Sequence, residues 1–281
     1  MDKNIVVYSS TFRKNHTILQ ILKELFSKVK KYKYQIILSI KKKIQTTYQK
    51  DTFGLFWAIV MPIIPMTVYV LLAHIKVFNS VDTMPFVFYI GAGMFVWLLM
   101  ATTIRNVMLS IKEDKAILGT TDFPIIASML SQLGGVLNDS LIRIFAVIAI
   151  IFWCQIDSSL LSVFLAILAL IPVILISFSL GVISAILDML IQDTRRVVDV
   201  FLRYGLFLSS VIFPFPVDGV LGSVNNFNFF NTYVVAVRDL IYFGSIENLE
   251  LFVYTSIFSL LLFLIAMNLV YSLDYKIRAY L

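Results

Sequence analysis

The stretch LLSVFLAILALIPVILISFSLGVISAIL at residues 160–187 contains no Asp, Glu, Lys or Arg. A helix needs about 20 consecutive, mostly apolar residues to cross the hydrocarbon core of a bilayer. Residues 160–187 exceed that length without a single charge. The stretch therefore predicts a transmembrane helix, and with it an integral membrane protein.

The same criterion finds further runs on both sides of this stretch. We expect six spans, at residues 53–75, 86–104, 125–153, 160–187, 197–213 and 249–271. The connections are short and no internal repeat is evident. The predicted fold is an all-α integral membrane protein with one domain over residues 1–281: a tail at 1–52, a six-span bundle at 53–271 and a second tail at 272–281.

The composition of the chain excludes a water-soluble fold. Hydrophobic residues make up 59% of the 281 residues and charged residues only 14%, whereas a soluble domain has about 25% charged residues. The single cysteine, Cys154, excludes an intrachain disulfide. We expect it to be a small apolar packing residue.

The distribution of basic residues predicts the orientation of the spans. Cytoplasmic segments of membrane proteins carry an excess of Lys and Arg. With the amino terminus inside, the inner segments hold nineteen basic residues and the outer segments only Lys76 and Arg238. We therefore expect a multi-pass protein of the cytoplasmic (inner) membrane with both termini in the cytoplasm. The excess of positive charge before residue 54 favours attraction to anionic lipid, and without an RNA-binding signature no nucleic-acid partner is expected.

The segment YQIILSIKKKIQTTYQK at residues 34–50 is both basic and periodic. Its apolar residues recur at three- and four-residue intervals, which places them on one helical face: Ile36, Ile37, Ile40, Ile44 and Tyr48. This pattern predicts an amphipathic helix that lies in the membrane interface, with Lys41, Lys42 and Lys43 near the lipid head groups. The alternative is a solvated basic tail.

Two other segments outside the spans are predicted to be helical. SIKEDKAILGTTDF at residues 110–123 predicts a short cytoplasmic helix that Gly119 ends. A short helix of this kind could serve as the contact site for a cytosolic partner protein. The alternative is that the segment is only a tight connection between two spans. The outer segment 213–249 begins with Pro and Gly but continues as FFNTYVVAVRDLIYFG. Its apolar residues favour a re-entrant or interface-lying helix, with an ordinary packed loop as the alternative.

The sequence lacks the motifs of a membrane enzyme. His16 and His74 share no spacing with a carboxylate cluster, and neither G-x-S-x-G nor H-E-x-x-H occurs. We therefore expect no catalytic residue and no metal site. None of the eleven glycines is followed by Lys, so the chain has no G-x-x-x-x-G-K-[ST] loop and any ATP that drives it must be hydrolysed by another polypeptide.

Charged and aromatic residues at membrane depth are candidates for contact with a substrate. Asp139/Arg143 and Asp199/Arg203 are four residues apart, so each pair can neutralise itself on one helix. The alternative is that an arginine faces a cavity and binds phosphate. Aromatic residues anchor spans at the interface, but inward-facing ones could stack on sugar rings. The candidate channel contacts are Trp57, Tyr69, Trp97, Arg143 and Arg203.

The sequence LSIKKKIQTTYQKDTFGLFWAIVMPI at residues 38–63 resembles the amino-terminal signature of ABC-transporter permeases of the polysaccharide-export family (ABC-2 type). In that family a basic amphipathic segment leads through an aromatic residue and a Gly to a Trp and a Pro. Here these are Tyr48, Gly54, Trp57 and Pro62. Further similar stretches follow in order at residues 88–106, 117–142 and 188–214.

The resemblance implies a specific assembly. Two copies of the chain would pair as a homodimer and dock two copies of a separate ATP-binding subunit, which holds ATP and Mg, and this chain would carry no cofactor. The segment at 34–50 would be the interface helix, with Lys41, Lys42, Lys43 and Tyr48 near a lipid head group. Re-entrant gate helices would lie between spans five and six. The coupling helix would involve Ile111, Lys112, Glu113, Asp114, Lys115 and Ile117.

The family exports long glycans (capsule, O-antigen or teichoic acid), often carried on a membrane lipid through a phosphate. The resemblance therefore implies the membrane subunit of a polysaccharide exporter. The alternatives are an ABC permease for a drug or a lipid, a membrane enzyme acting on lipid-linked sugars, and a scaffolding membrane protein.

Overall fold

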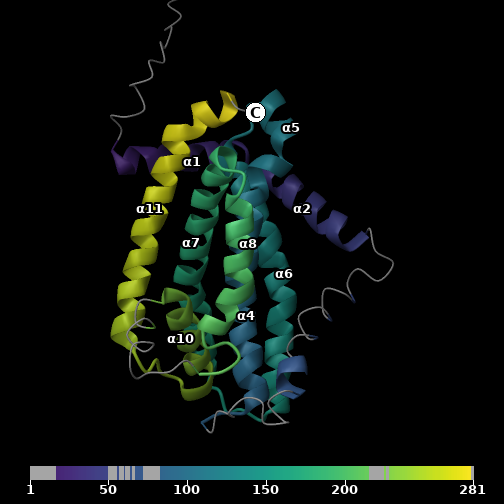
Figure 1. Ribbon diagram of the computed structural model, residues 1–281, viewed down its shortest axis with the longest axis vertical. Coiled ribbons are helices and arrows are strands. Elements are labelled where there is room, and N and C mark those ends of the chain that lie inside the picture. The colour runs from purple at the N-terminus through teal and green to yellow at the C-terminus, as the bar shows by residue number, and fades with distance from the viewer. Residues whose placement is uncertain are drawn as a thin grey trace, which may run out of the picture.

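The computed structural model describes residues 17–49, 56, 60, 64, 67–71, 83–214, 225 and 228–279. Within these residues the fold is helical and contains no β-strand (Figure 1). The helices are α1 (Ile18–Lys31), α2 (Lys33–Gln49), α4 (Phe86–Glu113), α5 (Lys115–Thr120), α6 (Ile125–Trp153), α7 (Leu160–Leu190), α8 (Thr194–Tyr204), the 3-10 turn η2 (Gly205–Leu208), α10 (Phe229–Phe243) and α11 (Leu249–Ala279).

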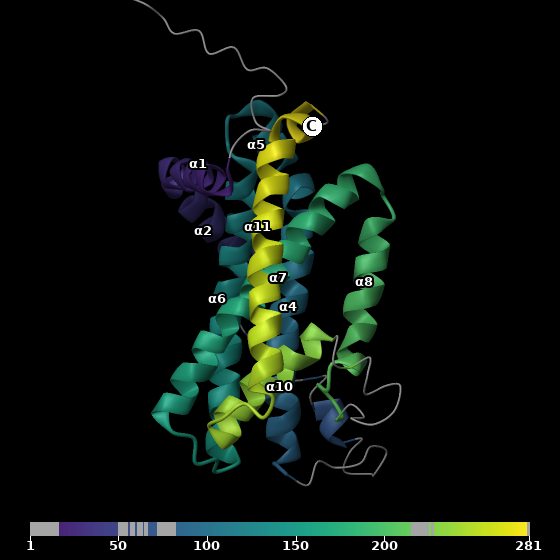
Figure 2. The same ribbon diagram turned by 90° about the vertical axis from the view of Figure 1, so that its left-hand side faces the viewer.

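Four helices in the described part of the chain are long and apolar enough to cross a membrane: α4, α6, α7 and α11. They run side by side along the long axis of the molecule (Figures 1 and 2). They coincide with the predicted second, third, fourth and sixth spans, as a multi-pass membrane protein requires. Most of the predicted first span lies outside the described residues. The structure describes residues 56, 60, 64 and 67–71 of this span, and they are helical.

The centre of the bundle is α4. In its most apolar stretch 78% of the residues are buried, against 17% in α6 and 11% in α11. A glycine allows α7 to approach α4 closely, because a Cβ on Gly181 would lie 2.7 Å from Cβ of Val107 and 3.1 Å from the carbonyl oxygen of Ile104. Small residues at helix crossings are typical of packing in membranes.

The predicted fifth span is not one continuous helix. The α-helix α8 has 11 residues and ends at Tyr204, and η2 follows at Gly205–Leu208. Ser210 then has a φ of 47°, which a helix cannot continue through. Two carbonyls freed by this break receive side-chain donors: Nδ2 of Asn228 donates to Leu208 at 2.6 Å, and the guanidinium of Arg238 donates to Ser210 at 2.6 Å.

Both donors belong to the segment that was predicted as an outer helix. Oδ1 of Asn228 accepts from the backbone N–H of Asn231 and caps α10, and Gly244 ends α10 with a φ of 74°. The apolar face of α10 is buried against α4 and α7, as Val234 and Val237 illustrate. The broken segment after α8 and helix α10 therefore form one packed unit.

The amino-terminal region contains two helices, although the sequence predicted only the second. The second, α2, matches the predicted segment closely. The first, α1, begins with a capping box between Thr17 and Gln20 and is fixed to α11 by a hydrogen bond of 2.8 Å from the Tyr271 hydroxyl to Glu24. Both helices project from one side of the bundle (Figure 2).

Both amino-terminal helices keep large apolar side chains exposed. These side chains are 55–76% exposed: Leu19, Phe26, Tyr34, Ile37 and Leu38. Ile36, by contrast, is buried, so the isoleucines predicted to share one face are divided between a packed side and an exposed side. An exposed apolar side beside lysines is the pattern of a helix at a membrane interface.

Candidate functional site

The most distinctive site is the corner where α4 gives way to α5. The helix α4 ends at Glu113, Asp114 has φ −94° and ψ 15°, and α5 occupies only Lys115–Thr120. A short helix between the second and third spans is thus confirmed. Its extent differs from the prediction, because Ile111, Lys112 and Glu113 form the last turn of α4.

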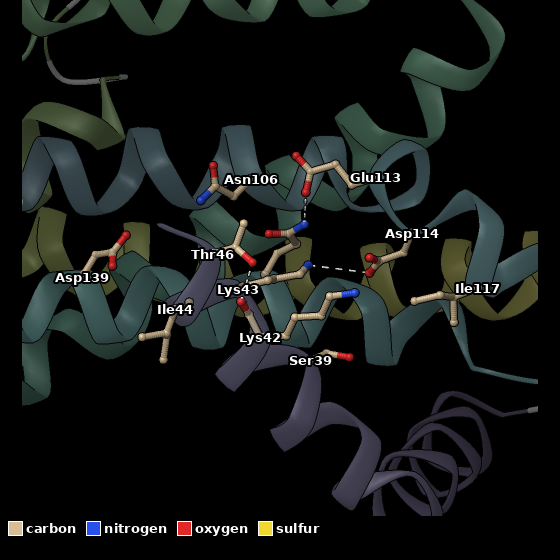
Figure 3. Close-up of a pocket in the computed structure, with 12 residues that line it drawn as sticks. Ser39, Lys42, Lys43, Ile44, Thr46, Asn106, Glu113, Asp114, Ile117 and Asp139 are labelled. Atoms are coloured by element: carbon tan, nitrogen blue, oxygen red, sulfur yellow. Dashed lines mark hydrogen bonds and ion pairs between the residues drawn. The ribbon is translucent and has the colours of Figure 1, made fainter. Parts of the chain in front are cut away.

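The two acidic residues at this corner face other helices. Ser128 of α6 donates its hydroxyl to the Asp114 carboxylate at 2.5 Å, and Gln132 of α6 donates its amide to the Glu113 carboxylate at 2.5 Å. Lys43 of α2 lies 3.6 Å from Asp114 (Figure 3). Glu113 and Asp114 therefore fix the corner to α6 and α2.

Lys43 makes this contact from a largely desolvated position. Burial lowers the pKa of its ammonium group below the usual value, because the charged form loses hydration, while the nearby Asp114 and Glu113 carboxylates oppose that shift. A pair of this kind depends on both partners, since removing one strands the other charge.

A third connection comes from the end of α11. The guanidinium of Arg278 donates to the carbonyls of Leu118, Thr121 and Phe123 at 3.1, 3.2 and 2.5 Å. The Leu118 carbonyl lies in the last turn of α5 and the other two follow the helix. Unsatisfied backbone acceptors and the helix dipole favour a cation at this end. Arg278 also lies 3.6 Å from Asp274 on its own helix.

The remaining surface of α5 is open. Ile111 and Leu118 are each 1% exposed and pack into the bundle. Lys115, Ala116 and Ile117 are exposed, with Ile117 at 42%. Of the six residues that the sequence assigned to coupling, Lys115 and Ile117 therefore face outward, while Ile111 is core.

A pocket of about 470 Å³ lies beside this corner, between α2, α4, α5 and α6 (Figure 3). Lys42 and Lys43 line it, whereas Lys41 does not. The remaining lining residues are Ser39, Ile44, Thr46, Asn106, Glu113, Asp114, Ile117, Gln132, Gly135 and Asp139. The structure thus separates two of the three predicted head-group lysines from the third, and the side chain of Tyr48 lies outside the described residues.

The sequence did not predict a second charged cluster near the same end of the bundle. The Asp188 carboxylate, 1% exposed, lies 2.6 Å from Nζ of Lys112 and 3.7 Å from Arg195. It joins the ends of α4, α7 and α8. An acidic residue directly after the uncharged run 160–187, with two arginines seven and eight residues later, was the signal for it.

Two of the predicted channel contacts lie together. Trp97 and Arg203 line a pocket of about 330 Å³ between α4 and α8, together with Arg105 and Asp199. Asp199 is 3.4 Å from Arg105 and does not pair with Arg203 as its helical spacing suggested. Trp97 is 3% exposed and packs against Phe230 of α10, so only part of the indole ring can face the pocket.

Tyr69 and Arg143, the other predicted channel contacts that the structure describes, are not among the residues that line this pocket. The ring of Tyr69 lies edge-on to Phe207 of η2, with centroids 6.4 Å apart. Arg143 lies half-buried on α6, and α6 and α8 lie on opposite sides of the bundle (Figure 2). Trp57 lies outside the described residues.

Comparison with protein-family models and with curated proteins identifies no relative of this chain: no protein-family model matches it, and no curated protein matches its sequence. Within the described residues no three His, Cys, Asp or Glu side chains lie together in a way that could hold a metal ion. The functional argument therefore rests on the site's own geometry.

Proposed function

We propose that this chain is the membrane subunit of an ATP-driven exporter that moves a lipid-linked polysaccharide across the cytoplasmic membrane. In this proposal a homodimer of six-span subunits has both termini in the cytoplasm, and α10 is re-entrant. Two separate ATP-binding subunits supply the energy, because the sequence has no phosphate-binding loop of its own.

The observation that carries the proposal is the α5 corner. A short helix with an outward face of Lys115 and Ile117 is held by contacts to α2, α6 and α11. A partner that pushed on this helix would therefore move three other helices. Such a rigidly held short helix is what a partner's conformational change needs in order to act on a membrane bundle.

The pocket between α4 and α8 supports the substrate part of the proposal. It places Arg105 and Arg203 beside a small part of Trp97. Arginine forks suit phosphate oxygens, and a phosphate-linked glycan presents such oxygens.

Co-purification tests the proposal. The tagged chain is expected to bring an ATP-binding protein with it, and the chain purified alone is expected to show no ATP turnover. Ile117→Asp should abolish the capture, because it places a charge on the apolar part of the outward α5 face. The matched control is Asp157→Lys, an exposed residue in the turn after the other end of α6, which should leave capture unchanged.

The outcomes separate the alternatives. ATP turnover by the chain alone would contradict the subunit assignment. If the Ile117→Asp and Asp157→Lys variants capture equal amounts of the ATP-binding protein, α5 is not the docking helix.

A further inference from the structure

The helix α8 is attached to the bundle with little apolar burial. None of its 11 residues is buried. Val197, Val200 and Tyr204 point outward and are 57–66% exposed. On the other side of the helix, Val198 and Leu202 are only partly buried against the core. Apolar packing therefore holds α8 weakly, and its charged contacts with α4 matter for its position.

Two charged contacts connect one side of α8 to one side of α4. Lys112 of α4 and Arg195 of α8 share the buried Asp188 carboxylate, and Arg105 of α4 lies 3.4 Å from Asp199 of α8. Arg105 and Lys112 are two turns apart on α4, and Arg195 and Asp199 are one turn apart on α8. The Arg105–Asp199 contact is the exposed one, with side chains 59% and 33% exposed, and exposed ion pairs contribute little.

The geometry of this exposed pair leaves Arg105 open to a stronger partner. The 3.4 Å separates Nε of Arg105 from Oδ1 of Asp199, whereas a strong charge-assisted hydrogen bond measures about 2.7–2.9 Å. Asp199 therefore compensates the charge of Arg105 without a short hydrogen bond to it. An anion that makes close, bidentate contact with the guanidinium can take the place of Asp199.

Arg203 supplies a second guanidinium to the same pocket. It follows Asp199 by one turn of α8, and it makes neither an ion pair nor a hydrogen bond with any residue that the structure describes. The charged lining residues are Arg105, Asp199 and Arg203, so the pocket has an excess of one positive charge. Its volume of about 330 Å³ is within the range of about 300–1,000 Å³ that is usual for small-ligand sites.

The charged side of the pocket lies near a boundary of the hydrocarbon core. With 28 residues α4 is about 42 Å long, longer than a hydrocarbon core of about 30 Å. Counting about 20 residues from Phe86 puts the boundary near Arg105, and the pocket residues Trp97 and Leu98 lie on the core side of it. An anionic group can reach this depth either from the solution or as part of a membrane lipid.

We propose that a terminal phosphate binds between Arg105 and Arg203 and replaces Asp199 as the counter-ion of Arg105. Phosphate oxygens accept from both guanidinium groups. The attachment of α8 to α4 at this point then passes through the ligand, from Arg105 to Arg203, one turn further along α8 than before. This exchange of counter-ions rests on the substrate part of the proposed function and is independent of the ATP-binding partner.

Native mass spectrometry of the full chain in detergent tests the proposal with dioleoyl-phosphatidic acid, a lipid that ends in a phosphate. Dioleoylglycerol has the same chains without the phosphate and is the matched ligand. Phosphatidic acid is expected to bind at least about tenfold more tightly, and Arg203→Gln should lose about that factor, because it removes a hydrogen bond between charged groups. Asp199→Asn should instead tighten binding by up to about fivefold, the worth of an exposed ion pair.

The surface pair Asp193 and Arg196 provides the controls. Both side chains are exposed and lie outside the pocket lining, so Asp193→Asn and Arg196→Gln remove the same charges and should leave binding unchanged. In an Arg105→Gln background the gain from Asp199→Asn should shrink, because Asp199 and the phosphate no longer compete for Arg105. Thermal unfolding of each variant confirms that it is folded.

Inorganic phosphate identifies the source of the group. Displacement of phosphatidic acid by excess inorganic phosphate would support the proposal with a soluble ligand. Retention of phosphatidic acid in that excess would support it with a phosphate carried by a membrane lipid.

The outcomes separate this proposal from the proposed function. Equal binding of phosphatidic acid and dioleoylglycerol, or Arg203→Gln equal to Arg196→Gln, would overturn the phosphate site and with it the substrate part of the proposed function. A preference for phosphatidic acid that Asp199→Asn and Asp193→Asn leave equally unchanged would overturn only the exchange of counter-ions. The same gain from Asp199→Asn with and without Arg105 would also overturn the exchange, because it would show a general effect of charge.

Discussion

At the residue scale, Arg238 has the most unusual environment in the described part of the chain. It is 2% exposed, its guanidinium lies 3.6 Å from the ring centroid of Tyr89, and it donates to the Ser210 carbonyl. Arginine is rarely buried without partners. Here a stacking ring and a carbonyl acceptor compensate part of the lost hydration, and the same contacts hold the broken segment after α8.

Replacement of Arg238 should therefore destabilise the fold. Arg238→Met leaves the buried Ser210 carbonyl without its donor and removes the cation from Tyr89. We expect a loss of about 2 kcal/mol in the free energy of unfolding, which corresponds to a drop of roughly 4–8 °C in Tm. Thermal unfolding in detergent, followed by circular dichroism, measures this drop.

The control for that experiment is Arg196→Met. The Arg196 side chain is 86% exposed and its ion pair with Asp193 lies on the surface, where such pairs contribute little. Its Tm should equal that of the parent protein. A Tm of Arg238→Met equal to that of Arg196→Met would contradict the role of Arg238.

Counting charges along the sequence assigned Arg238 to an outer segment. Charge counts ignore burial, so they did not show that this arginine is packed inside the fold. Val234, Arg238 and Ile241 lie at spacings of four and three residues, which puts the arginine on the apolar face of a helix.

At the element scale, the docking of α2 on α6 depends on one glycine of a pair. A Cβ on Gly134 would lie 2.8 Å from Cγ1 of Ile40 in α2, whereas a Cβ on Gly135 would meet nothing within 4 Å. The two glycines are adjacent on the same helix, so they offer a matched comparison.

Gly134→Val should loosen α2 and Gly135→Val should not. Overpacking costs about 1–3 kcal/mol, which is at least about fivefold in the equilibrium for local opening. Hydrogen–deuterium exchange of the amides in residues 33–49 should therefore be faster in Gly134→Val and unchanged in Gly135→Val. Equal exchange in both variants would contradict close packing of α2 on α6.

The elements differ in how far the sequence predicted them. The existence of α2 and α5 followed from apolar periodicity and from Gly and Pro, which are local signals. The partners of Glu113 and Asp114 could not be predicted, because Ser128, Gln132 and Lys43 reach them only in the folded chain. The break after α8 was not predicted, because the fifth span was identified from its apolar residues alone. Gly205, Ser209 and Ser210 in the same stretch were not taken into account.

At the scale of the whole molecule, composition predicted the class but not the arrangement. The most apolar stretches of α4 and α11 have similar mean hydropathies, 1.9 and 2.2. Yet 78% of the α4 stretch is buried, and only 11% of the α11 stretch. In a membrane protein both the core and the lipid-facing surface are apolar. Apolarity therefore cannot distinguish a central helix from a peripheral one.

The orientation in the membrane can be tested with the native cysteine removed. In a Cys154→Ser background, Lys115→Cys places a thiol on α5 and Asp157→Cys places one beyond the other end of α6; both positions are exposed. A membrane-impermeant maleimide should label Asp157→Cys in intact cells and Lys115→Cys only after permeabilisation. The reverse pattern would contradict cytoplasmic termini, and labelling of both in intact cells would show that α6 does not span.

The break after α8 also has a consequence for the order of events during biosynthesis. The carbonyls of Leu208 and Ser210 take their donors from Asn228 and Arg238, 20 and 28 residues further along the chain. The ribosome makes the chain from its amino terminus, so the acceptors are synthesised, and leave the exit tunnel, before their donors do. Buried acceptors without donors cost free energy. The segment after Tyr204 can therefore settle into its final position only once α10 has been synthesised and packed.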